Sequence, residues 1–428
     1  MKLIKQAYRR FSAFQPIFPS PFNVRSLRFD HYAKKAQDGK LDYGKTLAMW
    51  VADMDFQSPP NVIRELEKCA SHGLFVYQHI TAEDKLAILN YLKNVHNLPK
   101  YSETSLVFLP GLVVGLNLCT RAFTNVGEAV MFACPVYHQF FHCVKNQNRV
   151  VAAIPLIRDE QTQNWTFDFS AMAERVDNSP NLPNVRLFIL CNPHNPVGKV
   201  FSKEEIMKLL DFCKARNILV VSDEIHCDLI LSSRKHISAL NLGHDDIVIS
   251  LNSPSKTYNL AGIGSAFAVI PNPDLHVKFK TESRGVLADI SIFGLAAMRV
   301  AYSQQESRDW SDGLRCYLQE NRDMLSTELK EKVGDLIQFN ATDHEATYLA
   351  WLDCSKLMSH IENRTGTRPI AIADFFLKEA DIAMNDGSQF YGGDNSKGRD
   401  FARLNFACSK ETLHEAVLRL ERVSLPYM

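Results

Sequence analysis

Three short apolar runs in the middle of the chain constrain its fold most strongly. They are Val185–Cys191, Ile218–Ser222 and Ile247–Leu251, and β-branched or other apolar residues fill most of each run. Strands with such nearly continuous apolar sequences are typical of a parallel sheet that is covered on both faces. The runs therefore predict an α/β fold with a mostly parallel central sheet.

A helix is predicted between the first two runs. Ser202 can cap its first turn, and Glu205 follows three residues later, as a capping box requires. Apolar residues then recur at the helical period between positions 206 and 213, and Asn217 is a typical stop. The order strand, helix, strand supports parallel pairing of the two strands.

The C-terminal part of the chain has a different pattern, which predicts a smaller α+β domain. The expected helices and strands are Asp309–Val333, Tyr348–Asp353, Ile370–Glu379, Phe401–Phe406 and Lys410–Val423. The Gly-, Asp-, Asn- and Ser-rich segment Asn385–Gly398 is expected to be a mobile loop.

The length of 428 residues makes two domains the default expectation. We place a large domain at 61–300 and a small domain at 301–428. Residues 1–60 are expected to supply an N-terminal arm and part of the small domain.

The charges and cysteines argue against several classes of function. Lys and Arg together number 48, as do Asp and Glu, so no net charge attracts nucleic acid or an anionic membrane. The ten cysteines form no C-x-x-C pair and no zinc-finger spacing, so we expect neither a structural metal nor disulfides. Thiols in a reducing compartment favour the cytoplasm. No apolar stretch approaches the roughly 20 residues that span a bilayer.

The N-terminal segment leaves two interpretations open. Its first 29 residues contain six Lys or Arg and no Asp or Glu, which resembles an organelle transit peptide. Pro16, Pro19 and Pro21 interrupt any long helix there and favour an ordered arm on a cytoplasmic protein.

Polar clusters follow directly after each of the three buried runs. They are Asn192–Gly198, Asp223–His226 and Asn252–Thr257. Because ligands of open parallel sheets bind outside the carboxyl ends of the strands, these clusters are expected to converge on one site. Each cluster alone could be a turn, a helix cap or a solvated loop, but a shared position at three strand ends favours a site.

The residue types in these clusters suit pyridoxal phosphate. Lys256 at a crowded strand end can lose its proton and form an imine with an aldehyde. Asp223 can pair with a protonated pyridine nitrogen, and Asn195 can hydrogen-bond the phenolic oxygen of the ring. Tyr137 can stack on the face of the ring.

The phosphate of this cofactor requires donors, and two places supply them. Ser253 and Ser255 offer hydroxyl groups beside the lysine. The turn Pro110–Val113, with Gly111, Leu112 and Val113, precedes the helix-like segment Val114–Phe123. The N-terminus of a helix favours an anion, so these three residues are further candidates for the phosphate.

The motifs N-P-x-N-P-x-G at 192–198, S-D-E-x-H at 222–226 and S-x-S-K at 253–256 resemble the aspartate aminotransferase superfamily of fold type I. The resemblance covers about residues 40 to 425. It implies that Arg403, in A-R-L-N-F, binds the α-carboxylate of an amino acid substrate.

A narrower branch is indicated by M-W-V-A-D-M-D-F at 49–56, which is similar to the cystathionine β-lyase branch of bacterial C–S lyases. His226, where most aminotransferases carry Tyr, and Y-L-A-W-L-D at 348–353 fit the same branch. The resemblance implies a homodimer in which Tyr77 reaches the cofactor phosphate of the neighbouring subunit. It also implies that Ala52 and Tyr137 contact the substrate, and His226 the cofactor.

The chain departs from the family pattern at several positions. Many relatives have an arginine for the phosphate eight residues after the lysine, where this chain has Gly264. Val76-Tyr77-Gln78 replaces a more usual Gly-Tyr-Thr, and His138 stands where a proline is common. These changes leave the substrate preference open.

Several site residues also have a purely structural interpretation. Asp223 can cap the following turn, His226 can be a buried structural histidine, and Arg403 can belong to a structural ion pair. Gly111 can serve its turn alone, and Trp50 and Trp351 can be core residues.

Three functions follow from these expectations. A C–S β-lyase would release thiol, pyruvate and ammonia, whereas an aminotransferase would release a keto acid, and both use the same lysine and arginine. A cofactor-binding regulatory protein is the third, but no helix-turn-helix or basic segment supports a DNA-binding form. The branch resemblance favours the lyase.

Overall fold

The computed structural model describes residues 14, 16–18, 26–37, 46–159, 164–179 and 181–428. The chain forms two compact units. The large unit comprises Phe14, Ser58–His194 and Lys199–Gly313, and the small unit comprises Asn195–Gly198, Leu314–Met428 and the described residues from 16 to 57. Most of the segment that resembles a transit peptide lies outside the described residues.

The large unit is built on an eight-stranded sheet of order β2-β9-β8-β7-β6-β3-β4-β5. The strands are β2 (Leu106–Leu109), β3 (Ala129–Cys134), β4 (Val150–Arg158), β5 (Trp165–Phe167), β6 (Val185–Cys191), β7 (Leu219–Asp223), β8 (Val248–Asn252) and β9 (Ala266–Val269). The five strands from β8 to β4 pair in parallel, while β9 and β5 run antiparallel to their neighbours. The predicted α/β fold is confirmed, with a mixed sheet.

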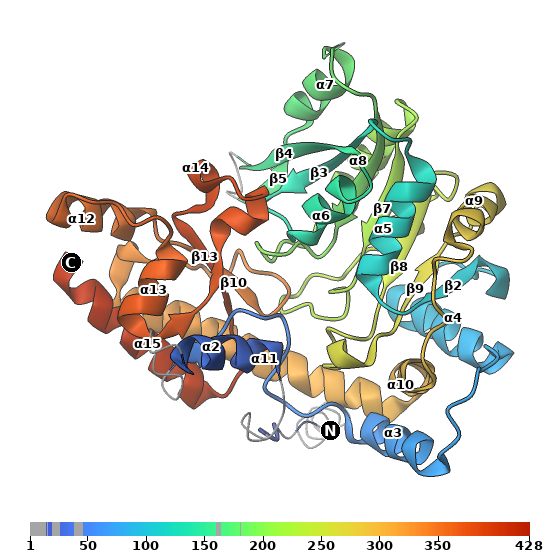
Figure 1. Cartoon of the computed structure of the whole chain (residues 1–428), viewed down its shortest axis with the longest axis horizontal. Helices are drawn as coiled ribbons and strands as arrows, with labels where there is room; N and C mark the ends of the chain where they lie inside the picture. The colour runs from blue at the N-terminus through green and yellow to red at the C-terminus, as the bar shows by residue number, and fades with distance from the viewer. Residues whose placement is uncertain (1–13, 15, 19–25, 38–45, 160–163, 180) are drawn as a thin grey trace. The chain divides into compact units, whose positions relative to one another are not determined.

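Helices cover the sheet of the large unit (Figure 1). They are α3 (Pro60–His72), α4 (Ala82–His96), α5 (Leu112–Phe123), α6 (Gln139–Lys145), α7 (Phe169–Asp177), α8 (Lys203–Lys214), α9 (Pro273–Ser283) and α10 (Ile292–Ser303). Helix α5 contacts β2, β6, β7, β8 and β9 and lies between α6 and α9, whereas α8 packs on β7. Every residue of β3, β7 and β8 except Leu219 is buried, which confirms that both faces of the sheet are covered.

The capping box predicted for α8 is present. The Ser202 hydroxyl accepts from the backbone N–H of Glu205 at 3.2 Å, and the Glu205 carboxylate accepts from the N–H of Ser202 at 2.7 Å. The apolar residues between 206 and 213 that we assigned to one face are buried. Asn217 adopts a left-handed conformation with φ 54°, so the chain turns there into β7.

The described residues of the small unit form two short sheets. Strands β10 (Leu349–Asp353), β13 (Phe401–Asn405) and β12 (Asn385–Asp386) pair antiparallel in that order, and β1 (Leu47–Ala48) pairs parallel with β11 (Ile382–Ala383). The helices are α2 (Leu27–Gln37), the part of α11 (Gln305–Lys332) from Leu314 onward, α12 (Ser355–Thr365), α13 (Ile372–Ala380), α14 (Asn395–Gly398) and α15 (Lys410–Ser424). The predicted α+β pattern is therefore confirmed.

The expectation of a mobile loop at Asn385–Gly398 is wrong. The segment contains β12, a 3-10 helix at Gly387–Tyr391 and α14. Asp386 and Asp394 cap the two helical turns, because their carboxylates accept from the N–H groups of Ser388 at 2.9 Å and Ser396 at 3.0 Å. The Gly- and Asp-rich composition thus serves tight packing.

Gly198, at the end of the N-P-x-N-P-x-G motif, is held in a left-handed conformation with φ +70°. A Cβ atom there would lie 2.2 Å from Nδ1 of the buried His344. We expect Gly198→Ala to lower the free energy of unfolding by about 2–4 kcal/mol, from backbone strain together with overpacking. Urea denaturation of the cofactor-free protein measures this change.

Gly73 supplies the matched control for that prediction. It has φ +73°, but a Cβ atom there would meet nothing within 4 Å. Gly73→Ala should therefore cost only the left-handed backbone penalty of about 1 kcal/mol. Equal losses in the two variants would show that the contact with His344 does not matter.

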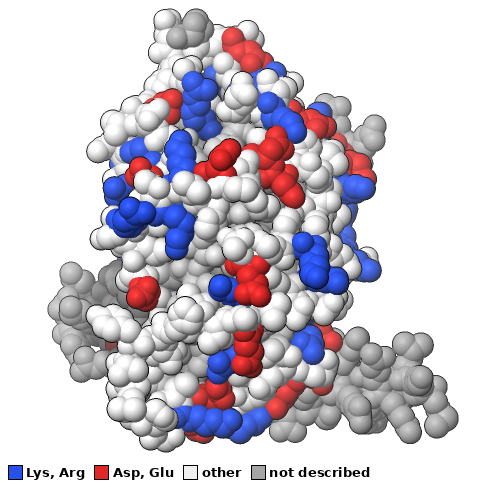
Figure 2. All heavy atoms as spheres, turned by 90° about the vertical axis from the view of Figure 1, so that its right-hand side faces the viewer, with Lys and Arg blue, Asp and Glu red and all other residues white. Residues whose placement is uncertain are grey.

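Two surface properties bear on possible partners. No helix in the described ranges is both long and apolar enough to cross a membrane. Figure 2 shows basic and acidic side chains interspersed over the face that it draws. That distribution offers no broad basic surface on this face for a polyanion.

Candidate active site

The carboxyl ends of β6, β7 and β8 lie next to one another in the large unit. The register pairs Cys191 with Asp223 and Asp223 with Leu251, so the three strands end at one edge. Lys256 follows β8 in a turn, and its charge is close enough to lower the pKa of Asp223. The structure thus brings Asp223 and Lys256 together, as the spacing predicts.

Asp223 is a buried carboxylate with an unusual pKa. Its burial raises the pKa to about 7, and the neighbouring Glu224 adds to the rise. The N–H of Ile225, which donates to the carboxylate at 3.1 Å, and the charge of Lys256 oppose it. The side chain therefore caps its turn, and it would still be stabilised by a further positive group.

Glu224, the next residue, shows the opposite behaviour. Burial alone would raise its pKa, but hydrogen bonds from His236, Ser238 and Ser222 hold the pKa below its usual value. The Ser222 and Ser238 hydroxyls each donate at 2.9 Å, and His236 Nε2 lies 3.3 Å from the other carboxylate oxygen. Glu224 is thus a structural carboxylate held by three side chains, whereas the Asp223 carboxylate at the same strand end accepts from the backbone N–H of Ile225.

The two serines before Lys256 lie differently. Ser253 is buried and its hydroxyl donates to the Ser265 carbonyl at 2.6 Å, while it accepts from the N–H of Ser255 at 3.0 Å. To donate to a phosphate, Ser253 would have to leave that carbonyl. The buried hydroxyl of Ser265 has no hydrogen-bond partner among the described residues. Our sequence interpretation did not single out Ser265, because its carbonyl meets Ser253 only in the folded chain.

Behind the Lys256 turn lies a buried network centred on Asp228. Its carboxylate accepts from the Tyr91 hydroxyl at 2.6 Å, contacts His96 Nε2 at 2.8 Å and receives the Thr257 hydroxyl at 3.4 Å. The ligand-type atoms of His96, Cys227 and Asp228 lie within 4.8 Å of one another, as in a metal site. Cys227 Sγ lies 3.6 Å from His96 Nε2, so the three groups are joined in one hydrogen-bond network in this structure.

The N-terminus of α5 is available to an anion. Gly111 stands at its N-cap without a side-chain cap, and a Cβ atom there would meet nothing within 4 Å. The helix begins at Leu112, two residues before the expected Val114, and Gly111 is its N-cap residue. Leu112 and Val113 therefore contribute N–H groups of the first turn, which are the orphan donors of a helix.

Gly264 explains the missing arginine. It has φ +69°, and a Cβ atom there would lie 2.9 Å from the Pro110 carbonyl oxygen. An arginine at this position would be strained in its backbone and would press on the turn before α5. The close approach also places the segment after Lys256 beside that turn, so the lysine and the helix N-terminus belong to one region.

The aromatic candidates of the large unit differ in how far they are buried. Tyr137 follows β3 and is partly buried, with its ring 4.8 Å from that of His138 in an edge arrangement. His226 is buried in the turn after β7. Tyr77 is 97% exposed, and Leu74, Phe75 and Val76 beside it are more than 60% exposed. Within this one chain, Tyr77 therefore faces solvent.

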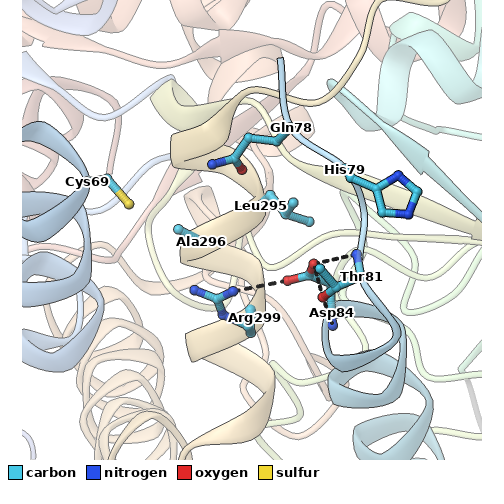
Figure 3. A pocket seen from close by; sticks show the side chains of 8 residues that line it. All are labelled: Cys69, Gln78, His79, Thr81, Asp84, Leu295, Ala296 and Arg299. Atoms are coloured by element: carbon cyan, nitrogen blue, oxygen red, sulfur yellow. Dashed lines mark hydrogen bonds and ion pairs between the residues drawn. The ribbon is translucent and has the colours of Figure 1, made fainter. Parts of the chain in front are cut away.

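A pocket adjoins the segment that carries Tyr77 (Figure 3). Its lining residues are Cys69, Gln78, His79, Thr81, Asp84, Leu295, Ala296 and Arg299. Arg299 donates to Asp84 at 3.3 Å and to Glu65 at 3.0 Å, so its charge is paired. No pattern in the sequence singled out this pocket, which forms only when α3, α4 and α10 pack.

The small unit holds a second group of candidates around Arg403 on β13. This buried guanidinium donates to the side-chain oxygens of Asn195 at 3.1 Å and Asn385 at 2.6 Å, and to the Trp50 carbonyl at 2.9 Å. It also lies 5.0 Å from the centre of the Phe390 ring. The structure therefore places two predicted residues, Asn195 and Arg403, in contact. Asn385 was not predicted, because its segment had the composition of a loop.

The M-W-V-A-D-M-D-F string lies beside β13. The Asn405 side chain donates to the carbonyls of Val51 and Asp53 at 2.6 Å each, and the Tyr348 hydroxyl donates to the Ala52 carbonyl at 3.0 Å. These bonds fix the backbone around Ala52. The string is thus a structural partner of the strand that bears Arg403.

Comparison with known proteins finds a family model and many relatives of high coverage, of which three are described here. The model of aminotransferase class I and II matches residues 47–420. Cystathionine beta-lyase PatB of Bacillus subtilis is 33% identical over 382 residues, which are 88% of this chain and 92% of that protein. Cystathionine beta-lyase of Corynebacterium glutamicum is 29% identical, over 88% and 93% of the two chains. The crystal structure of cystalysin from Treponema denticola, which contains pyridoxal 5'-phosphate, superimposes with a TM-score of 0.84 at 26% identity, covering 96% and 99%.

Proposed function

The chain belongs to the aminotransferase class I and II family, and from this membership we propose that it is a pyridoxal-phosphate-dependent carbon–sulfur β-lyase. It cleaves the Cβ–S bond of a sulfur amino acid and, with one water, yields a thiol, pyruvate and ammonium. The choice of reaction rests on the 33% identity to a cystathionine beta-lyase over 88% of the chain. Lysine, aspartate and arginine at these positions would serve an aminotransferase as well.

The residues of the large unit fit the cofactor. When bound, pyridoxal phosphate supplies an electron sink that makes the Cα proton of an amino acid acidic. The buried Asp223, with its raised pKa, suits the protonated ring nitrogen. The uncapped N-terminus of α5 at Gly111, Leu112 and Val113 suits the phosphate. The other proposed contacts are Tyr77, Tyr137, His226, Ser253 and Ser255 of the large unit, together with Asn195 of the small unit.

The chain's own residues divide the remaining work. Lys256 attaches the cofactor through its amine and, once the substrate amine has replaced it, accepts the Cα proton at Nζ. Arg403 binds the substrate α-carboxylate through a pair of charge-assisted hydrogen bonds. Asn195 and Asn385 orient the guanidinium by accepting from it. The Tyr348 and Asn405 hydrogen bonds hold the backbone of Ala52, which we propose to contact the substrate.

The proposal is tested by supplying purified holoenzyme with L-cystathionine or L-cysteine in the absence of any keto acid. We expect pyruvate, ammonium and the released thiol or sulfide in equal amounts. The turnover should continue without a second substrate, since elimination regenerates the enzyme. If turnover instead requires an added keto acid and no thiol appears, the enzyme is an aminotransferase.

We further propose that the protein is a homodimer. Four consecutive large side chains, from Leu74 to Tyr77, are between 61% and 97% exposed. Contiguous exposed apolar residues of this kind mark protein contacts in soluble proteins. A second copy that covers this segment would let Tyr77 reach the phosphate of the neighbouring subunit.

A cytoplasmic location is also part of the proposal. All ten cysteines are free, and eight of them are buried. Free thiols persist in reducing compartments, whereas secreted proteins tend to pair them.

A further inference from the structure

Trp351 on β10 carries a buried hydrogen-bond donor that is not used within the described residues. The side chain is 8% exposed, and its indole nitrogen has no acceptor there. Trp50 in the same unit provides a contrast, because its indole N–H donates to the Arg28 carbonyl at 3.0 Å. Since burying an unpaired donor is costly, such a group calls for a specific explanation.

The position of Trp351 relative to Arg403 suggests one. Their Cα atoms are direct partners in the antiparallel pair β10–β13, so both side chains project from the same face of the small-unit sheet. The Trp351 ring stacks on Phe401 with centroids 5.3 Å apart and 4° between the planes, and Phe390 meets it edge-on at 5.2 Å. Phe390 in turn lies under the Arg403 guanidinium. Aromatic packing therefore fixes the indole beside the carboxylate-binding arginine.

A carboxylate needs more donors than one guanidinium edge supplies. Its two oxygens offer about four lone-pair positions, and a bidentate arginine fills two of them. A further donor on the same face could bind the carboxylate at little entropic cost if its side chain were already desolvated and rigid. The indole N–H has these properties.

We propose that the indole N–H of Trp351 donates to the α-carboxylate of the substrate, beside Arg403, and so helps to select amino acids with a free carboxylate. The inference rests on the proposed function for the nature of the substrate. Because the carboxylate keeps its charge throughout the reaction, the contact contributes equally to ground state and transition state. Its loss should therefore appear in KM and leave kcat unchanged.

The first test observes the indole group directly in the holoenzyme. With nitrogen-15-labelled tryptophan, propanoate should shift the indole N–H resonance of Trp351 saturably, since it offers a carboxylate and no amine. Propanamide with equimolar sodium chloride should leave the signal in place, because it lacks the charge. The Trp50 resonance should not respond to either compound, since its N–H is bound to Arg28. The spectra of Trp351→Phe and Trp50→Phe assign the two signals.

The second test is kinetic. Trp351→Phe keeps an aromatic ring against Phe401 and Phe390 but removes the N–H. We expect KM for L-cystathionine to rise about tenfold, as for loss of one hydrogen bond to a charged group, with kcat within twofold of the original. Trp165→Phe on β5, at the edge of the large-unit sheet, makes the same chemical change outside the small unit and is the control, which should leave KM within twofold.

The outcomes separate this inference from the proposed function. If the Trp351 resonance does not respond to propanoate, the inference is overturned even when β-elimination is intact. If the resonance responds but no thiol is released from L-cystathionine, the carboxylate contact stands and the lyase assignment fails. Should Trp351→Phe fold poorly, the spectra of the original protein still decide.

Discussion

Lys256→Ala is expected to lower kcat/KM for β-elimination by roughly 10³-fold or more, because the variant loses the group that both attaches the cofactor and accepts the Cα proton. Removing a positioned general base alone typically costs 10²- to 10⁴-fold. The visible absorbance that the bound cofactor gives through its lysine attachment should disappear in the same variant. Activity is measured as thiol released from L-cystathionine, and absorbance after dialysis.

Lys199 provides the control for this prediction. It is a buried lysine of the large unit and forms an ion pair with Glu205 at 3.2 Å. Lys199→Ala should disturb the start of α8 and lower stability, yet it should keep the visible absorbance. If Lys256→Ala retained the absorbance while Lys199→Ala lost it, the assignment of the cofactor lysine would be wrong.

The central sheet was predictable because its signals are local. The run Val185–Cys191 matches β6 at both ends, and the capping pair Ser202 and Glu205 marks the start of α8. Other strand ends differ by one residue from the predicted ones, because hydrogen bonds to the neighbouring strand set them. For example, β7 includes Asp223, which pairs with Leu251 of β8. Periodicity and capping depend on neighbours in sequence, so one sequence suffices to place them.

The segment Asn385–Gly398 shows why composition fails elsewhere. Its glycines do not mark freedom of the backbone, because a Cβ atom at Gly387 would lie 2.4 Å from the Gly398 carbonyl oxygen. Phe390 at its centre is fully buried. Close packing between two parts of one segment produces this order, and no local pattern encodes it.

The candidate site was predictable to the extent that its residues follow strands. Asp223 and Lys256 meet because β7 and β8 are neighbours. Asn385 and Trp351 come to Arg403 through the pairing of β12 and β10 with β13, which no spacing in the sequence reveals. Tyr77 shows a different limit, since its proposed role depends on a second chain.

Asp223→Asn should lower catalytic activity and raise the stability of the cofactor-free protein. A carboxylate beside the ring nitrogen raises the pKa of that nitrogen by one to three units and so keeps it protonated. Loss of the carboxylate should therefore lower kcat/KM by roughly 10- to 10³-fold. The amide oxygen can still accept from the N–H of Ile225, so the turn should keep its shape. Release of pyruvate from L-cystathionine measures the loss.

The cofactor-free protein should respond to the same change with a gain in stability above neutral pH. The pKa of Asp223 is raised from 3.8 to about 7 by burial, so the folded state holds its proton more tightly than the unfolded chain. The wild type therefore loses stability as pH rises from about 4 to about 7, by up to about 4 kcal/mol, and an amide avoids this loss. Urea denaturation at pH 5 and pH 8 should show the advantage of the variant growing with pH.

Glu224→Gln tests the sign of this argument, because the neighbouring carboxylate is equally buried and its pKa is lowered instead. A carboxylate of this kind stabilises the fold above its unfolded pKa, and the contribution disappears as pH falls through the folded pKa. Glu224→Gln should therefore weaken the cofactor-free protein at pH 8, where Asp223→Asn strengthens it. If both variants shifted stability in the same direction, the burial that the two carboxylates share would explain both changes. The pairing of Asp223 with the cofactor would then lose this support. Opposite shifts would show that the charge on Asp223, unlike that on Glu224, lowers folding stability in the cofactor-free protein. Such a charge is expected of the carboxylate that pairs with the cofactor.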